Sequence, residues 1–389
     1  ALAAGTLSGC SKAIDGTKTV ATVGDEKVTL GLASYMVRDQ QAQTMSYYNM
    51  LMSQYGVSGS ASNVWDQKGD DGKTVGESSK DGVMTTINQL YVLKAHAADY
   101  DVTITDDEEK AIKEAAAEFI KDNDEKILKK LAVSEDDIVT YLELVTIRSK
   151  MHDPMTADVD TEVSANEKDQ TRVTIVKVST EGTEKDDDGN TIDLTDEEKA
   201  QKKDLAQQVL DKVKASDDVA NADMDALAKE VDDSLSATAP AFTTAGSTDD
   251  TLDEAVQDAA LELKDGEVAD SVIEGDDGYY VVRLDKMLDE DATENKEKTV
   301  ISERKSDLFD STLEDWVKEE KIKVKDKVWD QITVTDSVSF VYKSADSSDD
   351  TKSSDVQDST EDTSSQDNSE DTTTEDTTTE DTAAEDSAE

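Results

Sequence analysis

The chain is poor in cysteine, histidine and aromatic residues. Its single cysteine, Cys10, rules out an internal disulfide and any zinc cluster built on cysteine. Its two histidines, His96 and His152, add little to the ligands that a transition metal needs. Aromatic residues make up only 4% of the 389 residues, so a core must be built largely from Ala, Val, Leu and Ile. The sequence therefore predicts no metal site and no bound cofactor.

Positive charge is scarce as well. The 40 Lys and Arg residues stand against 93 Asp and Glu residues, which gives a formal net charge of -53 and an isoelectric point near 4.1. Such a surface repels nucleic acids and anionic lipid headgroups. No apolar run reaches the roughly 18 residues that a membrane-spanning helix needs. Nucleic acid is therefore excluded as a partner, and residence at a membrane would require a covalent anchor.

The start of the sequence contains a candidate for that anchor. Residues 1–10 are small and apolar and end in Leu7-Ser8-Gly9-Cys10, which resembles the bacterial lipobox. Diacylglycerol on the thiol of Cys10 would supply two acyl chains, and two chains hold a protein stably where one is marginal. We expect residues 1–10 to be a signal-peptide remnant, with Cys10 tethering the protein to the outer face of the bacterial cytoplasmic membrane. The alternative is an accidental cysteine in a flexible leader.

Residues 11–165 are predicted to form a mostly helical region. Alternating apolar residues around Gly24-Asp25 predict a hairpin over residues 20–30. A helix should follow, because apolar residues recur at helical spacing: Tyr35, Met36, Tyr47, Met50, Leu51 and Tyr55. Met and Tyr side chains at this spacing could line a binding surface, but a core position is the favoured interpretation.

Further helices are predicted in the same region. Residues 83–98 have an amphipathic pattern that puts His96 on a helix face. The capping sequence Thr105-Asp106-Asp107-Glu108 predicts the start of the next helix. Ser134 and Asp137 predict the start of another, which ends near Pro154.

Residues 166–292 have a different pattern, which predicts a small antiparallel sheet flanked by helices. A β-branched strand is expected over residues 172–178 and a closing strand over residues 278–284. Between them the sequence predicts a turn at 186–190, helices at 195–213, 224–231 and 252–260, a loop at 236–250, and a turn into a strand at 261–268.

The end of the chain divides into two segments. Residues 293–343 are predicted to contain a helix over 300–319, followed by a short apolar stretch with Ile322, Val324, Val328 and Trp329. Residues 344–389 consist almost wholly of Ser, Thr, Asp, Glu and Ala, so they have little to bury and are predicted to be disordered. A solvated spacer is the favoured role for this acidic tail, and weak binding of divalent cations is the alternative.

The pattern is similar to a known family. Residues 171–290 resemble a parvulin-type (PpiC) peptidyl-prolyl isomerase domain, through Leu227-Ala228-Lys229-Glu230, Leu263-Lys264-Asp265-Gly266-Glu267-Val268 and Gly278-Tyr279-Tyr280-Val281-Val282. The flanking regions resemble those of the PrsA and SurA class of foldases. The resemblance implies an α+β fold in which the N- and C-terminal segments build a mostly helical chaperone domain. The parvulin-like domain is inserted between those segments.

The family's catalytic residues are not retained in this sequence. Parvulins carry a histidine in the first strand, another in the last, and a cysteine or aspartate between them. These positions fall at Thr174, Tyr280 and Ser234. The resemblance therefore implies a weak or inactive isomerase for which no catalytic residue is assigned. It also implies a shallow apolar substrate groove, lined by Phe242, Leu252, Val256 and Tyr280.

The leading hypothesis is a membrane-anchored, extracytoplasmic foldase whose partners are unfolded or partly folded secreted polypeptides. Two alternatives remain open. The first is an active isomerase with a rebuilt site, in which hydroxyls of Thr174, Ser234 and Tyr280 stabilise the twisted amide. The second is a surface structural or adhesive lipoprotein, for which the long acidic tail is the supporting feature.

Overall fold

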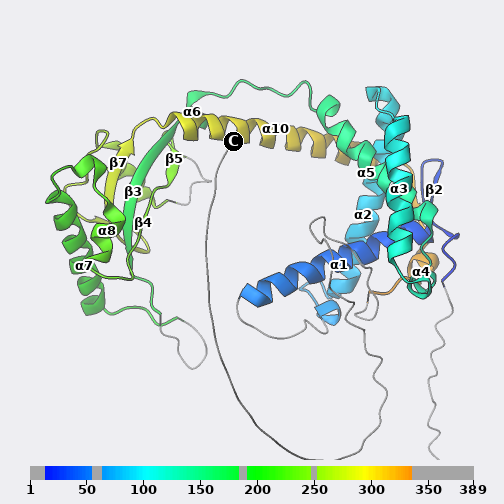
Figure 1. Ribbon diagram of the computed structural model, residues 1–389, viewed down its shortest axis with the longest axis horizontal. Helices are drawn as coiled ribbons and strands as arrows, with labels where there is room; N and C mark the ends of the chain where they lie inside the picture. The colour runs from blue at the N-terminus through cyan, green and yellow to red at the C-terminus, as the bar shows by residue number, and fades with distance from the viewer. Residues whose placement is uncertain (1–13, 55–63, 184–190, 247–251, 335–389) are drawn as a thin grey trace, which may run out of the picture. The chain divides into compact units, whose positions relative to one another are not determined.

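The structure is a computed structural model that describes residues 14–54, 64–183, 191–246 and 252–334 (Figure 1). Three predicted features lie outside these residues: the lipobox with Cys10, the turn at residues 186–190 and the acidic tail at residues 344–389. They remain predictions. Within the described ranges, no helix combines the length and the apolar character that crossing a membrane requires.

The N-terminal region is mostly helical, as expected. The strands β1 (Thr19–Val23) and β2 (Glu26–Thr29) form the predicted hairpin. The helices that follow are α1 (Leu30–Gln54), α2 (Val75–His96), α3 (Asp106–Asp122), α4 (Glu125–Leu131) and α5 (Glu135–Met155), with the short 3-10 helices η1 (Val64–Asp66) and η2 (Ala97–Tyr100).

The C-terminal segment completes this region. It contains α10 (Glu290–Glu319), β8 (Ile322–Val324) and α11 (Asp326–Trp329). Strand β8 pairs antiparallel with β1, with Ala21 opposite Val324, so β1 is the middle strand of the sheet β2-β1-β8. Phe309 and Leu313 of α10 belong to the same buried cluster as the N-terminal helices. Segments from the two ends of the described chain therefore share one core.

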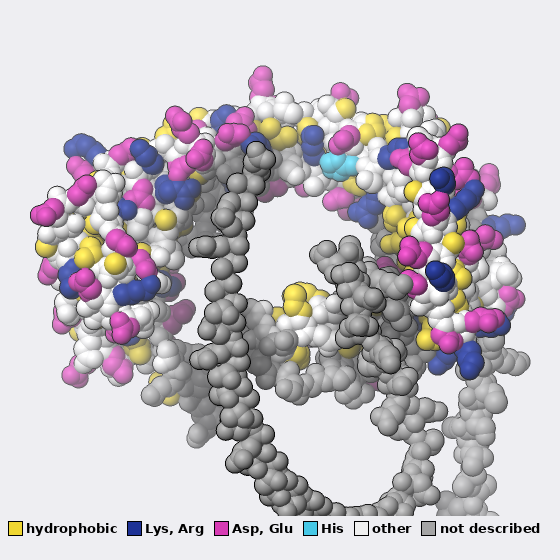
Figure 2. Space-filling view, in the orientation of Figure 1, with side chains coloured by type: hydrophobic (Ala, Val, Ile, Leu, Met, Phe, Trp, Pro, Cys, Tyr) yellow, Lys and Arg dark blue, Asp and Glu magenta, His cyan; other side chains and the backbone are white. Residues whose placement is uncertain are grey.

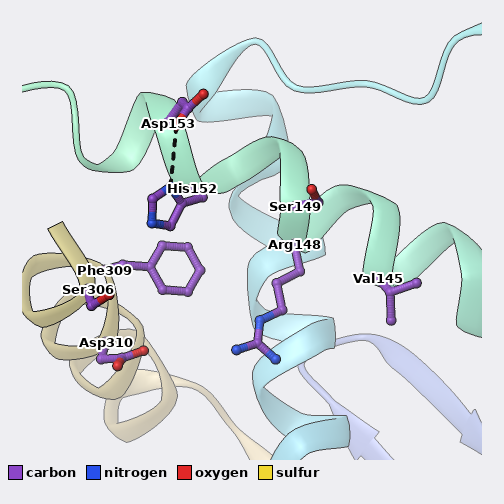
Figure 3. Close-up of a pocket in the computed structure, with 8 residues that line it drawn as sticks. All are labelled: Val145, Arg148, Ser149, His152, Asp153, Ser306, Phe309 and Asp310. Atoms are coloured by element: carbon purple, nitrogen blue, oxygen red, sulfur yellow. Dashed lines mark hydrogen bonds and ion pairs between the residues drawn. The ribbon is translucent and has the colours of Figure 1, made fainter. Parts of the chain in front are cut away.

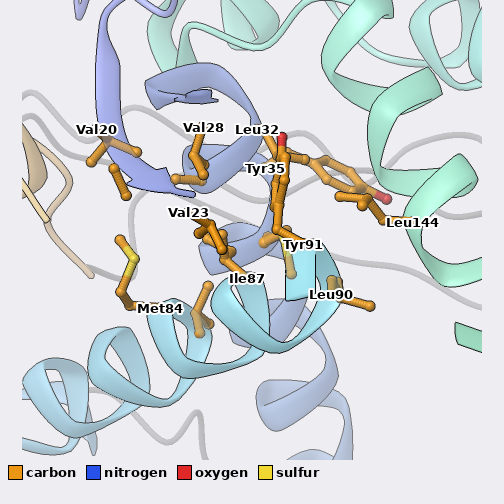
Figure 4. Close-up of a cluster of buried hydrophobic side chains, with 14 of the residues drawn as sticks. Val20, Val23, Val28, Leu32, Tyr35, Met84, Ile87, Leu90, Tyr91 and Leu144 are labelled. Carbon is orange, nitrogen blue, oxygen red and sulfur yellow. The ribbon is translucent and has the colours of Figure 1, made fainter. Parts of the chain in front are cut away.

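The core of the helical region is mainly aliphatic (Figure 4). Figure 4 shows Val20 and Val28 of the hairpin on the side of α2 that carries Met84 and Ile87. The few aromatic rings are used as contacts between helices: the ring of Tyr35 meets that of Tyr141 edge-on at 5.0 Å between centroids. Each aliphatic side chain buried in this way contributes roughly 1.5–3 kcal/mol, so many small contacts replace a few large ones.

One buried carboxylate, that of Asp137, joins the beginnings of α1 and α5. Its Oδ1 accepts a hydrogen bond from Oγ1 of Thr29 at 2.6 Å, and its Oδ2 accepts bonds from N and Oγ of Ser134 at 2.9 and 2.6 Å. Oγ1 of Thr29 in turn accepts the backbone N–H of Leu32 at 3.1 Å. A Cβ atom on Gly31 would lie 2.2 Å from Asp137 Oδ2, so only glycine allows this approach.

The remaining elements form an α/β region between α5 and α10 in sequence. They are α6 (Ala165–Lys168), β3 (Gln170–Ser179), α7 (Asp196–Lys214), the 3-10 helix η3 (Val219–Asn221), α8 (Met224–Lys229), β4 (Ala237–Thr238), β5 (Ala241–Thr243), α9 (Glu254–Leu261), β6 (Ile273–Glu274) and β7 (Gly278–Lys286).

The sheet of this region has two covered faces. Its strand order is β4-β3-β7-β6, with β5 also paired to β3, and every pairing is antiparallel. One face, with Val176 and Val281, packs against α7 and α8. The other face, with Val173 and Val282, packs against α9. The expected α+β class, mostly helical with a small antiparallel sheet, is therefore confirmed.

Several element boundaries differ from the sequence-based prediction. The expected loop at residues 236–250 contains β4 and β5, which are too short to produce an alternating pattern. The strand expected directly after residues 261–268 lies at β6, and Val268 makes only an isolated bridge. Helix α4, which the sequence analysis missed, is a short helix whose start is capped by Asp124.

Helix α10 begins ten residues earlier than the predicted start at residue 300. Its first turns are rich in Glu, Asp, Lys and Thr, so they carry no apolar periodicity. The start is fixed instead by Asp289, whose side chain accepts the backbone N–H of Ala292 at 2.9 Å. The predicted start at residue 300 rested on the apolar spacing alone.

The core interpretation of the Met and Tyr side chains of α1 is correct for only half of the helix. Tyr35 and Met36 are buried in the core. Tyr47 and Met50, which follow them by 12 and 14 residues in the same helix, are 58% and 61% exposed. Helical spacing places residues on one face, but it does not show whether another element covers that face along its whole length.

We predict that Asp137→Ala lowers the free energy of unfolding by about 2–4 kcal/mol, because it removes the capping-box bonds that Ser134 donates and a hydrogen bond from Thr29 to a buried charged group. Urea denaturation followed by circular dichroism measures this loss. Asp136→Ala is the matched control, since Asp136 lies in the same first turn and is exposed. Equal losses in the two variants would contradict the role given to Asp137.

A second prediction concerns pH. The hydrogen bond from Lys150, followed by that from the Thr105 backbone, lowers the pKa of Glu108 from 4.5 to about 2. Because the folded-state pKa is depressed, the stability that this charge contributes is complete above pH 4.5 and is lost as the pH falls toward 2. Glu108→Gln keeps the helix cap. Its melting temperature should therefore lie below that of the wild type at pH 7, and the gap should close between pH 4.5 and 2.

The control for this titration is Glu109→Gln, which removes a charge from an exposed pair with Lys113 in the same helix turn. It should change the melting temperature less than Glu108→Gln at neutral pH. A gap between wild type and Glu108→Gln that stays constant through the acid range would refute the assignment.

Candidate functional site

The three polar positions carried over from the parvulin family do not come together. Strands β3 and β7 pair with Thr174 opposite Arg283 and Lys177 opposite Tyr280. Since successive side chains of a strand point to opposite faces, Thr174 faces α7 and α8, whereas the ring of Tyr280 belongs to the cluster that packs on α9. Thr174 and Tyr280 thus lie on opposite faces of the sheet.

The third position, Ser234, is exposed and is engaged in a local turn. Its Oγ and its backbone N–H both donate to Oδ1 of Asp232, at 2.5 and 2.8 Å. These two hydrogen bonds, the side-chain one first, lower the pKa of Asp232. Such a pairing is typical of a structural Asx turn, and it connects Ser234 to neither of the other two positions.

Thr174 belongs to a polar cluster of its own. Its Oγ1 donates to Oδ2 of Asp285 at 2.6 Å, and Nε of Arg283 donates to Oδ1 of the same carboxylate at 2.7 Å. Nη1 of Arg283 also donates to the carbonyl oxygens of Val219 and Ala222, at 3.2 and 2.8 Å. Arg283 is buried, so the cluster fixes η3 to the sheet with each charge paired.

Tyr280 also has a charged partner. Its hydroxyl donates to Oδ1 of Asp277, and Nζ of Lys177 donates to Oδ2 of Asp277 at 2.5 Å. Burial, followed by the hydrogen bond to Asp277, raises the pKa of Tyr280 well above its ordinary range. Desolvation pushes the pKa of Asp277 upward, but the bonds from Lys177 and Tyr280 outweigh it and lower that pKa. The phenol therefore stays protonated and remains a hydrogen-bond donor at physiological pH.

The residues expected to line a substrate groove do come together, but they fill the space between them. Phe242, Val256 and Tyr280 are only 1%, 0% and 4% exposed, and Leu252 packs against them. The cluster lies between the sheet and α9, where it serves as the core of that face. These four residues are neighbours in a packed cluster and form no open apolar groove in the part of the chain that the structure describes.

The larger cavity that we find lies in the helical region, between α5 and α10 (Figure 3). Its volume is about 660 Å³, and it is lined by Val145, Arg148, Ser149, His152, Asp153, Ser306, Phe309 and Asp310. Figure 3 shows the Phe309 ring facing His152, and the ring centroids are 5.6 Å apart. Nδ1 of His152 lies 3.3 Å from Oδ1 of Asp153. The wall therefore combines an aromatic ring, charges of both signs and two hydroxyls.

A second cavity adjoins the first, since Val145 and Arg148 line both. It measures about 190 Å³ and lies among α1, α2 and α5; its other lining residues are Met36, Asp39, Gln40, Gln43, Val83, Thr86, Leu90 and Tyr141. Neither cavity could be predicted from a local sequence pattern, because the linings come from helices far apart in the chain. The predicted helix end near Pro154 is correct, since α5 ends at Met155, and His152 and Asp153 lie in its last turn.

The His and acidic residues do not form a metal site in the part of the chain that the structure describes. No group of three or more His, Cys, Asp or Glu side chains in those ranges could hold an ion. His96 is instead stacked on Trp316, with ring centroids 4.1 Å apart. It lies on a helix face, as predicted, and takes part in packing between α2 and α10.

A comparison with protein families identifies part of the α/β region. Residues 185–297 match the family model described as a PPIC-type PPIase domain, which confirms the parvulin-type resemblance drawn from the sequence. The match spans less than a third of the chain and begins after β3, the strand that carries Thr174. No curated protein matches the chain.

Several solved structures are similar to this chain. The foldase protein PrsA from Lactococcus lactis is 15% identical with a TM-score of 0.34, and the match covers 80% of this chain and 96% of that one. PrsA from Streptococcus pneumoniae is 17% identical with a TM-score of 0.30, covering 64% and 87%. A SurA-like chaperone from Campylobacter jejuni is 10% identical with a TM-score of 0.26, covering 79% and 99%.

Proposed function

We propose that this chain is an extracytoplasmic foldase that holds unfolded secreted polypeptides against its helical region. The observation that carries the proposal is the pair of adjoining cavities, about 660 and 190 Å³, among α1, α2, α5 and α10. The match of residues 185–297 to a PPIC-type PPIase domain supports it, because such a domain acts on polypeptide chains.

The lining of the cavities suits an unfolded chain better than one defined small molecule. The partly exposed Tyr141 and Val145 offer apolar contact, while the exposed Arg148 and Asp310 offer a donor and an acceptor for backbone amides. An unfolded polypeptide presents both kinds of group at every residue. Contacts of this mixed type bind many sequences weakly, as a protein that must release its clients requires.

The α/β region is proposed to be a weak or inactive isomerase. Lowering the barrier of about 18–20 kcal/mol to rotation of a prolyl bond requires polar groups that favour the twisted amide in one groove. Thr174 and Tyr280 lie on opposite faces, Ser234 bonds to its own turn, and the groove residues are packed. One observation favours the alternative of an active isomerase with a rebuilt site: the hydroxyl of Tyr280 is a protonated donor beside Lys177 and Asp277.

The proposal includes a cellular location and a division of the chain into domains. Diacylglycerol on Cys10 would tether residues 11–343 at the outer face of the bacterial cytoplasmic membrane, where secreted chains emerge. The proposed domains are a helical region at 11–165, a parvulin-like domain at 166–292 and a C-terminal segment at 293–343 that packs on the first. Residues 344–389 are proposed to be a solvated acidic spacer with at most weak affinity for divalent cations.

We predict that the purified protein slows the aggregation of a denatured secreted enzyme, followed by light scattering, at near-equimolar ratio. Ser306→Trp should weaken this protection, because an indole at this exposed position would occupy the larger cavity. Ser311→Trp is the matched control on another face of α10. Absence of protection by the wild type would rule out the proposed function, and equal protection by both variants would rule out the cavity as its site.

A refolding assay limited by prolyl isomerisation separates the two functional alternatives. We predict at most a weak acceleration, unchanged in Tyr280→Phe and in Ser234→Ala, because neither hydroxyl faces an open groove. A strong acceleration that disappears in either variant would show that the site has been rebuilt, and the α/β region would then be an active isomerase.

A further inference from the structure

The second half of α1 differs from the rest of the chain in its charge. No Asp, Glu, Lys or Arg occurs from Gln40 to Trp65, although such residues make up 34% of the sequence and a run of this length would hold about nine on average. The structure describes the first part of the run as residues 40–54, the last four turns of α1. We call these residues the neutral half of α1.

The neutral half of α1 presents apolar side chains to solvent. Tyr47 and Met50 are 58% and 61% exposed, more than any other large hydrophobic side chain in the described residues. They are three positions apart and so lie on one side of the helix. Met45, Tyr48 and Leu51 beside them are only half-buried. In Figure 2, hydrophobic and uncharged side chains are visible over this part of α1, whereas acidic and basic ones alternate over the α/β region.

Folding does not account for this surface. The first half of α1 supplies the side chains that the core needs, among them Leu32, Tyr35 and Val37. Exposed Met and Tyr side chains favour aggregation in the unfolded and folded states alike, so a polar helix end would serve stability better. Met is flexible and polarisable and adapts to partners of varied shape, and Tyr gives a large contact area at little entropic cost.

We infer that the neutral half of α1 is a docking surface for apolar and aromatic segments of unfolded polypeptides that carry no cluster of acidic residues. The inference rests on the proposed function and specifies which part of a client is bound first. Gln40 and Gln43 also line the smaller cavity, so the surface continues directly into the cavities assigned to clients.

The charge of the chain favours this occupant over others. A second copy would bring another net charge of -53 to the same place, and like charges at this density oppose self-association. A folded partner with a charged rim would find no charge on this surface with which to pair. An unfolded apolar segment needs no charged residue on this surface in order to bind. The acidic remainder of the chain attracts a segment that carries Lys or Arg and repels one that carries Asp or Glu.

The test is binding of a fluorescent peptide of Leu, Phe, Ser and Lys to the full chain, measured by anisotropy. The double variant Tyr47→Ser with Met50→Ser should bind the peptide at least about tenfold more weakly, because it removes two exposed apolar contacts. The matched control, Ile192→Ser with Leu288→Ser, removes two side chains that are 46% and 51% exposed elsewhere and should bind as the wild type does. A twin peptide with Glu in place of each Lys should bind the wild type more weakly.

Three results would overturn the inference. The first is unchanged peptide binding by the Tyr47→Ser, Met50→Ser variant, with its fold verified by circular dichroism. The second is a wild-type dimer in light scattering that this variant abolishes, which would make a second copy the occupant. The third is tighter peptide binding after residues 335–389 are removed, which would make that segment the occupant. Protection from aggregation is scored separately, so its persistence in the variant would leave the proposed function standing while the inference fails.

Discussion

The helical region depends on one buried carboxylate. Asp137 accepts hydrogen bonds from Thr29 at the entrance to α1 and from Ser134 at the entrance to α5, and so it fixes the angle between the two helices that carry most of the cavity lining. The N–H of Ser134 donates directly to this charge, and at α1 the contact runs through Oγ1 of Thr29, which itself accepts the N–H of Leu32. The α5 side of both cavities and the α1 side of the smaller one therefore begin at this residue.

The two halves of the protein use polar contacts in different ways. In the α/β region, the charged side chains form ion pairs with one another. Arg283 pairs with Asp285 on one face of the sheet, and Lys177 pairs with Asp277 beside Tyr280 on the other. The charged groups of these two clusters are already paired with each other, so they are not available to bind a ligand. In the helical region, Arg148 and Asp310 project from neighbouring helices into open volume. The open polar groups of the helical region are therefore better suited to binding a polypeptide than the paired charges of the α/β region.

Sequence patterns predicted most helices and strands correctly, but they did not predict which faces of those elements are buried. The capping residues Thr105, Ser134 and Thr195 each begin a helix, because a cap is a local interaction that the sequence states directly. Whether a face is covered is a long-range property, and so the periodicity that correctly buried Tyr35 wrongly buried Tyr47. The relation between Thr174 and Tyr280 depends on strand register, in which a shift of one residue exchanges the faces of the sheet. The residue pattern predicted both strands but not their register.

The pairing of β8 with β1 has a consequence for the synthesis of the protein. Almost 300 residues separate the two strands, so β1 lacks its second neighbour until nearly the whole chain has been made. At about 5–20 residues per second, that delay is roughly 15–60 s. During this time Val20 and Val23 border an incomplete sheet with an unpaired edge. A protein proposed to shelter half-made chains must therefore itself pass through a long half-made state.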